Sequence, residues 1–317
     1  MNRIKPLAGI LFCLSVLNPT AGSGNNPASE HKIDSLLRLM TLEEKVSMCA
    51  GAAPRMAFQG VPRLEIPEVQ CCDGPRGPNI GGQATAFPSG IAWGAAWNPA
   101  LAEKAGEVMG RETRAIGRGV LLGPANNILR DPLCGRFFEY YTEDPYLNSR
   151  ITVAAVKGIQ SEKVAACLKH YACNNQEENR RGVSSIVSER ALREIYLKGF
   201  EIAIKESQPK AIMTSYNKVN GVHTANSYDL CTTAARKEWG FAGIIMTDWT
   251  TTNADGGSSA AKCIAAGNDL VMSGTDTDRR EILDALSAEN DQYLEEKDLT
   301  ACAQRILEMI FTSNSYE

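Results

Sequence analysis

Short apolar runs alternate with longer amphipathic segments along most of the chain. The apolar runs, at residues 69–72, 120–122, 164–168, 211–214, 244–246 and 270–272, predict buried strands. The segments between and after them have apolar residues at helical spacing and predict helices at 100–117, 144–161, 188–206, 229–239, 258–266, 278–288 and 299–312. Strands that alternate with helices are typical of a parallel sheet with helical crossovers.

The number of strand–helix units favours one large α/β domain. At least six units follow one another, which indicates a (β/α)8 TIM-like barrel rather than an open doubly wound sheet. An incomplete or collapsed barrel is the open alternative. We expect the barrel domain to cover residues 30–317, after a leader and linker at residues 1–29. The capping-box pattern Thr41-x-x-Glu44 predicts that a helix begins after Thr41.

A polar cluster follows almost every predicted strand. The clusters lie at residues 73–76, 123–127, 169–171, 215–217 and 248–249. The carboxyl ends of the strands in a (β/α)8 barrel form one mouth, which is where such enzymes place their active sites. The sequence therefore predicts that five clusters, far apart along the chain, meet in one polar pocket.

Composition and charge argue against nucleic acid, metal ions and cofactors as partners of this chain. The chain has 317 residues, 33 Lys and Arg, 37 Asp and Glu, and a net charge of −4, which argues against a nucleic-acid-binding protein. With only three histidines, no metal site and no cofactor are expected. The ten cysteines include no C-x-x-C pair, so we expect mostly free, buried thiols.

The N-terminus has the order of a secretory signal. Arg3 and Lys5 precede an apolar run from Leu7 to Leu17, and small residues follow. This run is too short to span a bilayer, and no other stretch is long enough. We expect a secreted or periplasmic protein, with a cytoplasmic one as the alternative.

The candidate pocket residues suit a polyhydroxylated substrate. They combine carboxylates, long cationic donors and aromatic rings, and the sequence lacks both a P-loop and a G-x-S-x-G elbow. Paired acidic and basic groups can bind adjacent sugar hydroxyls, and a carboxylate can attack or stabilise the anomeric carbon.

Several motifs resemble the β-glucosidase group of glycoside hydrolase family 3. They are CDGPRG at 72–77, RDPLCGRFFEYYTEDP at 130–145, KHYACNNQEENR at 169–180, MTSYNKVNG at 213–221 and GFAGIIMTDW at 240–249. The resemblance runs from about Ile33 to the end of the chain. It implies a retaining, exo-acting hydrolase that releases terminal β-D-glucose, with the family's N-terminal barrel.

The resemblance also implies a role for each matching residue. Asp248 matches the nucleophile that forms a covalent glycosyl intermediate. The matching substrate-binding residues are Asp73, Arg136, Lys169, His170, Arg180, Met213, Tyr216 and Trp249. Taken alone, Met213 would be assigned to the core, Trp249 to a sugar platform or the barrel wall, and the two arginines to structural ion pairs.

The general acid/base is the missing part of this assignment. The β-glucosidases of the family take that glutamate from a C-terminal α/β sandwich domain, which we expect to be absent here or supplied by a second chain. The single-domain hexosaminidases use a histidine in a Gly-rich loop, whereas this chain has ACNNQ at 172–176. Glu177 and Glu178 are weak substitutes, and Phe137 stands where the family usually has Asn.

Three other interpretations stay open. A β-xylosidase or related exo-glycosidase would share the motifs, because subsite size is not legible in the sequence. A truncated, non-catalytic sugar-binding remnant would bind monosaccharides without turnover. A Schiff-base aldolase would use Lys169, at the end of a strand, as its amine.

Overall fold

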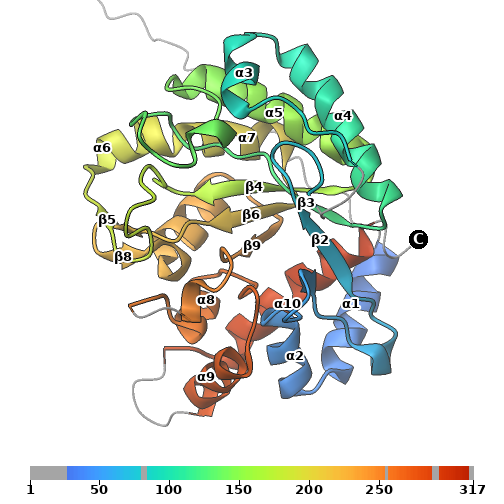
Figure 1. The fold of residues 1–317 in the computed structure, drawn as a ribbon. Coiled ribbons are helices and arrows are strands. Elements are labelled where there is room, and N and C mark those ends of the chain that lie inside the picture. Colours follow the sequence, from blue (N-terminus) through green and yellow to red (C-terminus); the bar gives the residue numbers. More distant parts are fainter. Residues whose placement is uncertain (1–26, 80–83, 254–255, 288–292, 314–317) are drawn as a thin grey trace, which may run out of the picture.

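A curled, mainly parallel sheet forms the centre of the molecule (Figure 1). The computed structural model describes residues 27–79, 84–253, 256–287 and 293–313, so the predicted leader lies almost entirely outside the described residues. The six strands follow the order β1 (Ala57–Phe58), β2 (Val69–Asp73), β3 (Val120–Leu122), β4 (Ala165–Tyr171), β6 (Ala211–Thr214) and β9 (Ile244–Met246). All neighbouring pairs are parallel except β1 and β2.

The ladder of hydrogen bonds makes part of a barrel. Beyond β9 it continues as a single parallel bridge between Met246 and Leu270, in place of the strand predicted at 270–272. The backbone there bonds partly to loops, since Val271 N–H donates to the Cys49 carbonyl and Thr250 N–H donates to that of Met272. Within the described ranges, no strand pairing joins this edge to β1, so the sheet is an α/β half-barrel and the complete eightfold ladder is not observed.

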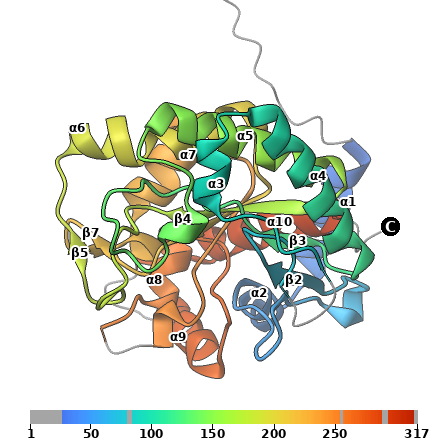
Figure 2. The same cartoon turned by 45° about the horizontal axis from the view of Figure 1, so that its top comes forward.

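The convex face of the sheet is covered by the long crossover helices. Helix α5 (Pro145–Ser161) packs between α4 (Pro99–Ala115) and α7 (Lys198–Ser207). The three helices form one layer on this side of the sheet (Figures 1 and 2). Alternate strand residues pack under them: Cys72, Leu121 and Ala166 with α4 and α5, and Leu168, Ile212 and Ile245 with α7 and the π-helical η5 (Asp229–Glu238).

The concave face is filled by the remaining helices. The inward strand residues Cys71, Leu122, Cys167, Met213 and Met246 belong to one core with α1 (Pro27–Leu39), α2 (Leu42–Cys49), α8 (Ala260–Ala265) and α10 (Glu296–Phe311). The capping box predicted at Thr41 opens α2. Helix α9 (Asp276–Ser287) packs beside α2 and α8.

One predicted helix is divided in the structure, and several small elements were not predicted. The segment predicted at 188–206 is divided into α6 (Glu189–Ala191), the π-helical η3 (Leu192–Tyr196) and α7. The unpredicted elements are β1 of the main sheet, α3 (Gly90–Ala95), a second sheet of β5 (Ser184–Ser185), β7 (Lys218–Val219) and β8 (Val222–His223), and the one-turn helices η1 (Pro62–Leu64), η2 (Phe137–Glu139), η4 (Thr224–Asn226) and η6 (Thr251–Asn253). These elements are too short to carry a hydrophobic period.

The cysteines that the structure describes are all free and buried, as predicted. Burial raises the pKa of the Cys72 thiol to about 11 and that of Cys173 to about 12, which keeps both as thiols near neutral pH. In the part of the chain that is described, no helix combines the length and apolar character needed to cross a bilayer.

A buried ion triad ties the C-terminal helix to the sheet. Asp269 is fully buried between Arg305 of α10, whose Nε lies 2.7 Å from Oδ1, and Arg236 of η5, which pairs with Oδ2. The backbone N–H of Ile245 on β9 also donates to Oδ2 at 2.7 Å. Removing one member of such a group leaves the others buried without compensation.

We expect Asp269→Asn to lower the free energy of unfolding by about 3–5 kcal/mol, because Arg236 and Arg305, whose side chains are only 13% and 22% exposed, lose their counter-charge. Chemical denaturation of the full chain measures this. Asp276→Asn is the matched control, since that side chain is 96% exposed and should change stability by less than about 0.5 kcal/mol. Equal effects of the two substitutions would contradict a stabilising role for the triad.

Candidate active site

Strand alternation brings three of the predicted site residues to one edge of the concave face. Asp73 pairs with Leu122 at the end of β2, and Lys169 on β4 pairs with Met213. Asp248 lies two residues beyond Met246, which pairs with Met213. Successive side chains on a strand point to opposite faces, so every second residue lies on the same face. Asp73, Lys169 and Asp248 therefore lie on the concave face, two residues after a buried apolar residue of the same strand row.

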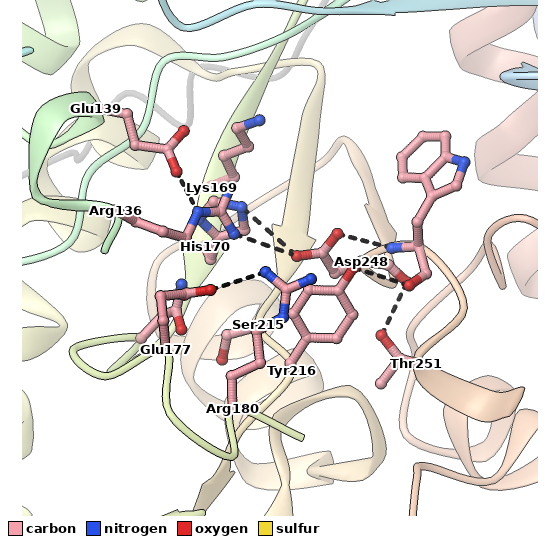
Figure 3. A network of polar contacts seen from close by, with 12 residues as sticks. Arg136, Glu139, Lys169, His170, Glu177, Arg180, Ser215, Tyr216, Asp248 and Thr251 are labelled. Atoms are coloured by element: carbon pink, nitrogen blue, oxygen red, sulfur yellow. Dashed lines mark hydrogen bonds and ion pairs between the residues drawn. The ribbon is translucent and has the colours of Figure 1, made fainter. Parts of the chain in front are cut away.

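Asp248 is buried, and among the described residues one of its oxygens has only long contacts, to His170 and Arg136 (Figure 3). Its Oδ1 accepts a 2.7 Å hydrogen bond from the backbone N–H of Trp249, which orients the carboxyl group. Its Oδ2 lies 3.6 Å from His170 Nε2 and 3.7 Å from Arg136 Nη1, and makes no hydrogen bond within the described structure. A buried acceptor that lacks a partner is costly, so this oxygen is available to a ligand.

Opposing effects set the charge of Asp248. Burial raises the pKa of the carboxyl group above its ordinary value of 3.8. The cations of Arg136 and Lys169, the Trp249 N–H and the Tyr216 hydroxyl act in the opposite direction. A carboxylate that is held among cations and poorly solvated is a suitable nucleophile toward an electron-poor carbon.

Lys169 and Asp73, two of the predicted substrate-binding residues, form an ion pair. Lys169 Nζ is buried and lies 2.8 Å from Asp73 Oδ1, while the Asp73 side chain is half exposed. Burial opposes the Lys169 ammonium, but Asp73 and Glu139 outweigh it and raise the pKa of the amine above its ordinary 10.5. Lys169 is therefore a donor, and the free amine that a Schiff-base aldolase needs is disfavoured.

The turn after β2 depends on a glycine. Gly74 has a φ of +155°, and a Cβ there would collide with the Gly77 carbonyl. Only glycine allows this close approach, which presents Asp73 at the edge of the pocket.

His170 is buried beside Asp248, and two hydrogen bonds from one side chain fix its backbone. Asn127 receives the His170 N–H on Oδ1 and donates from Nδ2 to the His170 carbonyl, each at 2.9 Å. Burial first, and then the cations of Arg136, Lys169 and Arg180, hold the pKa of His170 well below its ordinary 6.5. The ring is therefore neutral, with one nitrogen donating and the other accepting.

Arg136 joins two carboxylates at the start of η2. It pairs with the buried Glu139 through Nε and directs Nη1 toward Asp248. Arg136 can therefore have both of the roles considered for it, because Nε makes a structural ion pair while Nη1 faces the site. The Glu139 carboxylate is committed to this pair.

Arg180 and Tyr216 form the opposite side of the site. The Arg180 guanidinium lies 4.3 Å from the centre of the Tyr216 ring and 2.8 Å from Glu177 Oε2. Arg181 approaches the same ring at 5.2 Å. The Tyr216 hydroxyl donates to the Trp249 carbonyl at 2.8 Å, and so connects this side to the turn that carries Asp248.

Met213 and Trp249 lie against the core. Met213 is 1% exposed and forms the layer beneath Lys169 and Asp248. Trp249 is half-buried and packs on the same cluster as Met213. Met213 therefore supports the site from below, and Trp249 connects the Asp248 turn to the core.

Two buried residues near His170 were not singled out from the sequence. Tyr140 and Asn174 form a hydrogen-bonded chain that reaches the His170 ring. Their positions within the motifs at 130–145 and 169–180 were visible, but nothing in their spacing indicated that the two side chains meet.

A cavity of about 410 Å³ opens between the turn after β2 and the segment that carries Arg136. Asp73, Arg136, Phe138 and Glu139 contribute to its wall. This volume lies in the range of small-molecule sites. Among the side chains that the structure describes, no group of three or more His, Cys, Asp or Glu residues is suited to hold a metal ion.

Known proteins resemble this chain in sequence and fold. Residues 40–309 match the model of the glycosyl hydrolase family 3 N terminal domain. A β-glucosidase of Rhizobium radiobacter is 42% identical over 291 residues, which are 90% of this chain and 35% of that protein. An exo-α-(1→6)-L-arabinopyranosidase of Bifidobacterium longum is 44% identical over 223 residues, 66% of this chain and 29% of that protein.

A solved structure gives the same result. β-Glucosidase 3B from Thermotoga neapolitana in complex with α-D-glucose has a TM-score of 0.82 and 39% identity, and the match covers 90% of this chain and 43% of that one. The chain spans about a third of the length of the curated relatives described above. It belongs to glycosyl hydrolase family 3, and the part of the family that it matches is the N-terminal domain.

Proposed function

We propose that this chain carries the nucleophile and the sugar-binding subsite of a retaining, exo-acting β-glucosidase that releases terminal β-D-glucose. The observation that supports this most is the buried Asp248, whose unpartnered Oδ2 faces His170 and Arg136. The family membership and the β-glucosidase relatives support the reaction class.

The proposed first step is a displacement at the anomeric carbon. Asp248 Oδ2 forms a bond to this carbon as the bond to the glycosidic oxygen breaks, and the leaving group departs with the electron pair. Water then attacks the glycosyl–Asp248 ester and releases the sugar with retained configuration. Lys169 and His170 donate to sugar hydroxyls, while Asp73 accepts from them.

The general acid/base is not assigned to a described residue. Glu139 pairs with Arg136, Glu177 pairs with Arg180, and Glu178 is exposed. We propose that this group comes from outside the described residues, either from a further domain such as the family's α/β sandwich or from a second chain. Natural glucosides would then turn over slowly without that partner, because a positioned acid contributes about 10²–10⁴-fold.

Several broader assignments belong to the same proposal. We treat residues 30–317 as one domain, an incomplete (β/α)8 barrel, which the strand order and the Leu270 bridge support. The leader-like N-terminus supports a secreted or periplasmic location. A related exo-glycosidase remains the second candidate, because the Bifidobacterium longum relative is named for an L-arabinopyranoside.

Replacing the nucleophile should allow chemical rescue. We expect Asp248→Gly to lower kcat/KM for 2,4-dinitrophenyl β-glucoside by about 10³-fold or more, since this substrate depends on the nucleophile and not on an acid. Azide should restore release of the phenolate and give α-glucosyl azide, because azide takes the place of the missing carboxylate on the α face.

Product analysis by NMR after incubation with azide makes this measurement. Asp276→Gly, at a fully exposed carboxylate, should keep the wild-type rate and form no azide adduct. A β-glucosyl azide from Asp248→Gly would identify Asp248 as the acid/base instead, and full activity of the variant would exclude it from both roles.

The acid limb of the pH profile should report the Asp248 pKa. The carboxylate must be ionised to attack, so kcat/KM for the same substrate should fall as the pH drops through a pKa above 3.8. Arg136→Gln should move this limb to higher pH, because Arg136 is the strongest cation opposing the effect of burial.

The profile of Arg190→Gln provides the matched control. Arg190 is 85% exposed and makes only a helical i,i+4 pair with Glu194, so its loss should leave the limb in place. An acid limb that stays unchanged in Arg136→Gln would contradict the electrostatic role given to Arg136.

A further inference from the structure

The His170 ring is in contact with a buried tyrosine on its side away from Asp248. Tyr140 is 1% exposed, and its hydroxyl lies 3.2 Å from His170 Nδ1. The two rings meet edge to face with centroids 6.2 Å apart. The other ring nitrogen, Nε2, faces Asp248 Oδ2 at 3.6 Å and makes no hydrogen bond within the described residues.

A second side chain determines where the tyrosine proton goes. Asn174 is buried, and its Nδ2 donates to the Tyr140 oxygen at 2.8 Å. A phenolic oxygen that already accepts from Asn174 has its single proton free to donate to His170 Nδ1. A neutral imidazole that accepts at Nδ1 carries its own proton on Nε2.

The opposite proton order is electrostatically unfavourable. It would require Nδ1–H to donate to Tyr140 and would leave the Nε2 lone pair facing the carboxylate of Asp248. In a buried site, two acceptors at 3.6 Å repel each other, whereas an Nε2–H stabilises the carboxylate. The contacts on both sides of the ring therefore favour the same tautomer.

We infer that Tyr140, oriented by Asn174, is a positioning residue that fixes neutral His170 with its proton on Nε2, so that the ring donates into the site beside Asp248. His170 Nε2 is then a donor to a substrate hydroxyl, in the same sense as the Lys169 ammonium, and Asp73 is the acceptor of the set. The catalytic part of this inference rests on the proposed function, whereas the proton order does not.

NMR of the full chain labelled with ¹⁵N-histidine tests the proton order directly. Long-range ¹H–¹⁵N correlations distinguish a protonated from an unprotonated ring nitrogen, and His31 and His223 serve as internal references. We expect the wild-type His170 to have a protonated Nε2 and a hydrogen-bonded, unprotonated Nδ1 at neutral pH. A protonated Nδ1 would overturn the inference from the wild-type spectrum alone.

Variants test the role of the tyrosine. In Tyr140→Phe the His170 Nδ1 resonance should move in the direction of a nitrogen that has lost its hydrogen bond, and Asn174→Ala should move it in the same direction by a smaller amount. Tyr141→Phe is the matched control, because this neighbouring tyrosine is also buried but belongs to a separate apolar cluster. An unchanged Nδ1 resonance in Tyr140→Phe would contradict the contact.

Kinetics separate positioning from a merely structural role. We expect Tyr140→Phe to lower kcat/KM for 2,4-dinitrophenyl β-glucoside by about 10–100-fold, as loss of a residue that orients a ligand-binding histidine does in metal sites, and Tyr141→Phe to leave it unchanged. A wild-type rate in Tyr140→Phe would refute the positioning role. A wild-type chain that cleaves no glucoside, but shows the expected spectrum, would contradict the proposed function and leave the proton order established.

Discussion

The alternation of side chains along parallel strands is the constraint on which the site depends. The concave rows of β2, β4 and β9 each run through buried apolar residues and then, at the carboxyl end of the strand, change to a charged group. Asp73, Lys169 and Asp248 meet because β2, β4 and β9 end at the same edge of the sheet. A shift of one residue in any of these strands would turn its charged group toward the convex helices.

Ion pairing among the charged groups of the site leaves one oxygen of Asp248 without a hydrogen bond among the described residues. Lys169 is matched by Asp73, and Arg136 is matched by Glu139. His170 is kept neutral by burial and the surrounding cations. What remains is Asp248 Oδ2, a buried acceptor with donors on two sides and no hydrogen bond within the described structure. The same pairing keeps Lys169 protonated, which favours a hydrogen-bonding role over amine catalysis.

Much of the fold could be predicted because the apolar runs are short and clearly bounded. Five of the six runs are strands, and polar residues that follow different strands contact one another, as Lys169 does with Asp73 and Tyr216 with Trp249. The run at 270–272 is a single bridge, because hydrophobic pattern alone does not distinguish a strand from a buried loop whose backbone bonds elsewhere. The hydrogen-bonded chain from Asn174 through Tyr140 to His170 could not be predicted, since Tyr140 lies 30 residues before His170 and only the tertiary fold brings it to the end of β4.

The central claim is that Asp248 is the nucleophile, and covalent labelling tests it most directly. The full chain is incubated with 2,4-dinitrophenyl 2-deoxy-2-fluoro-β-glucoside, its intact mass is measured, and its peptides are mapped, with circular dichroism on the same sample to establish folding. The account predicts one added fluoroglucosyl group on Asp248. An adduct on another residue, or no adduct on a folded chain, would contradict it.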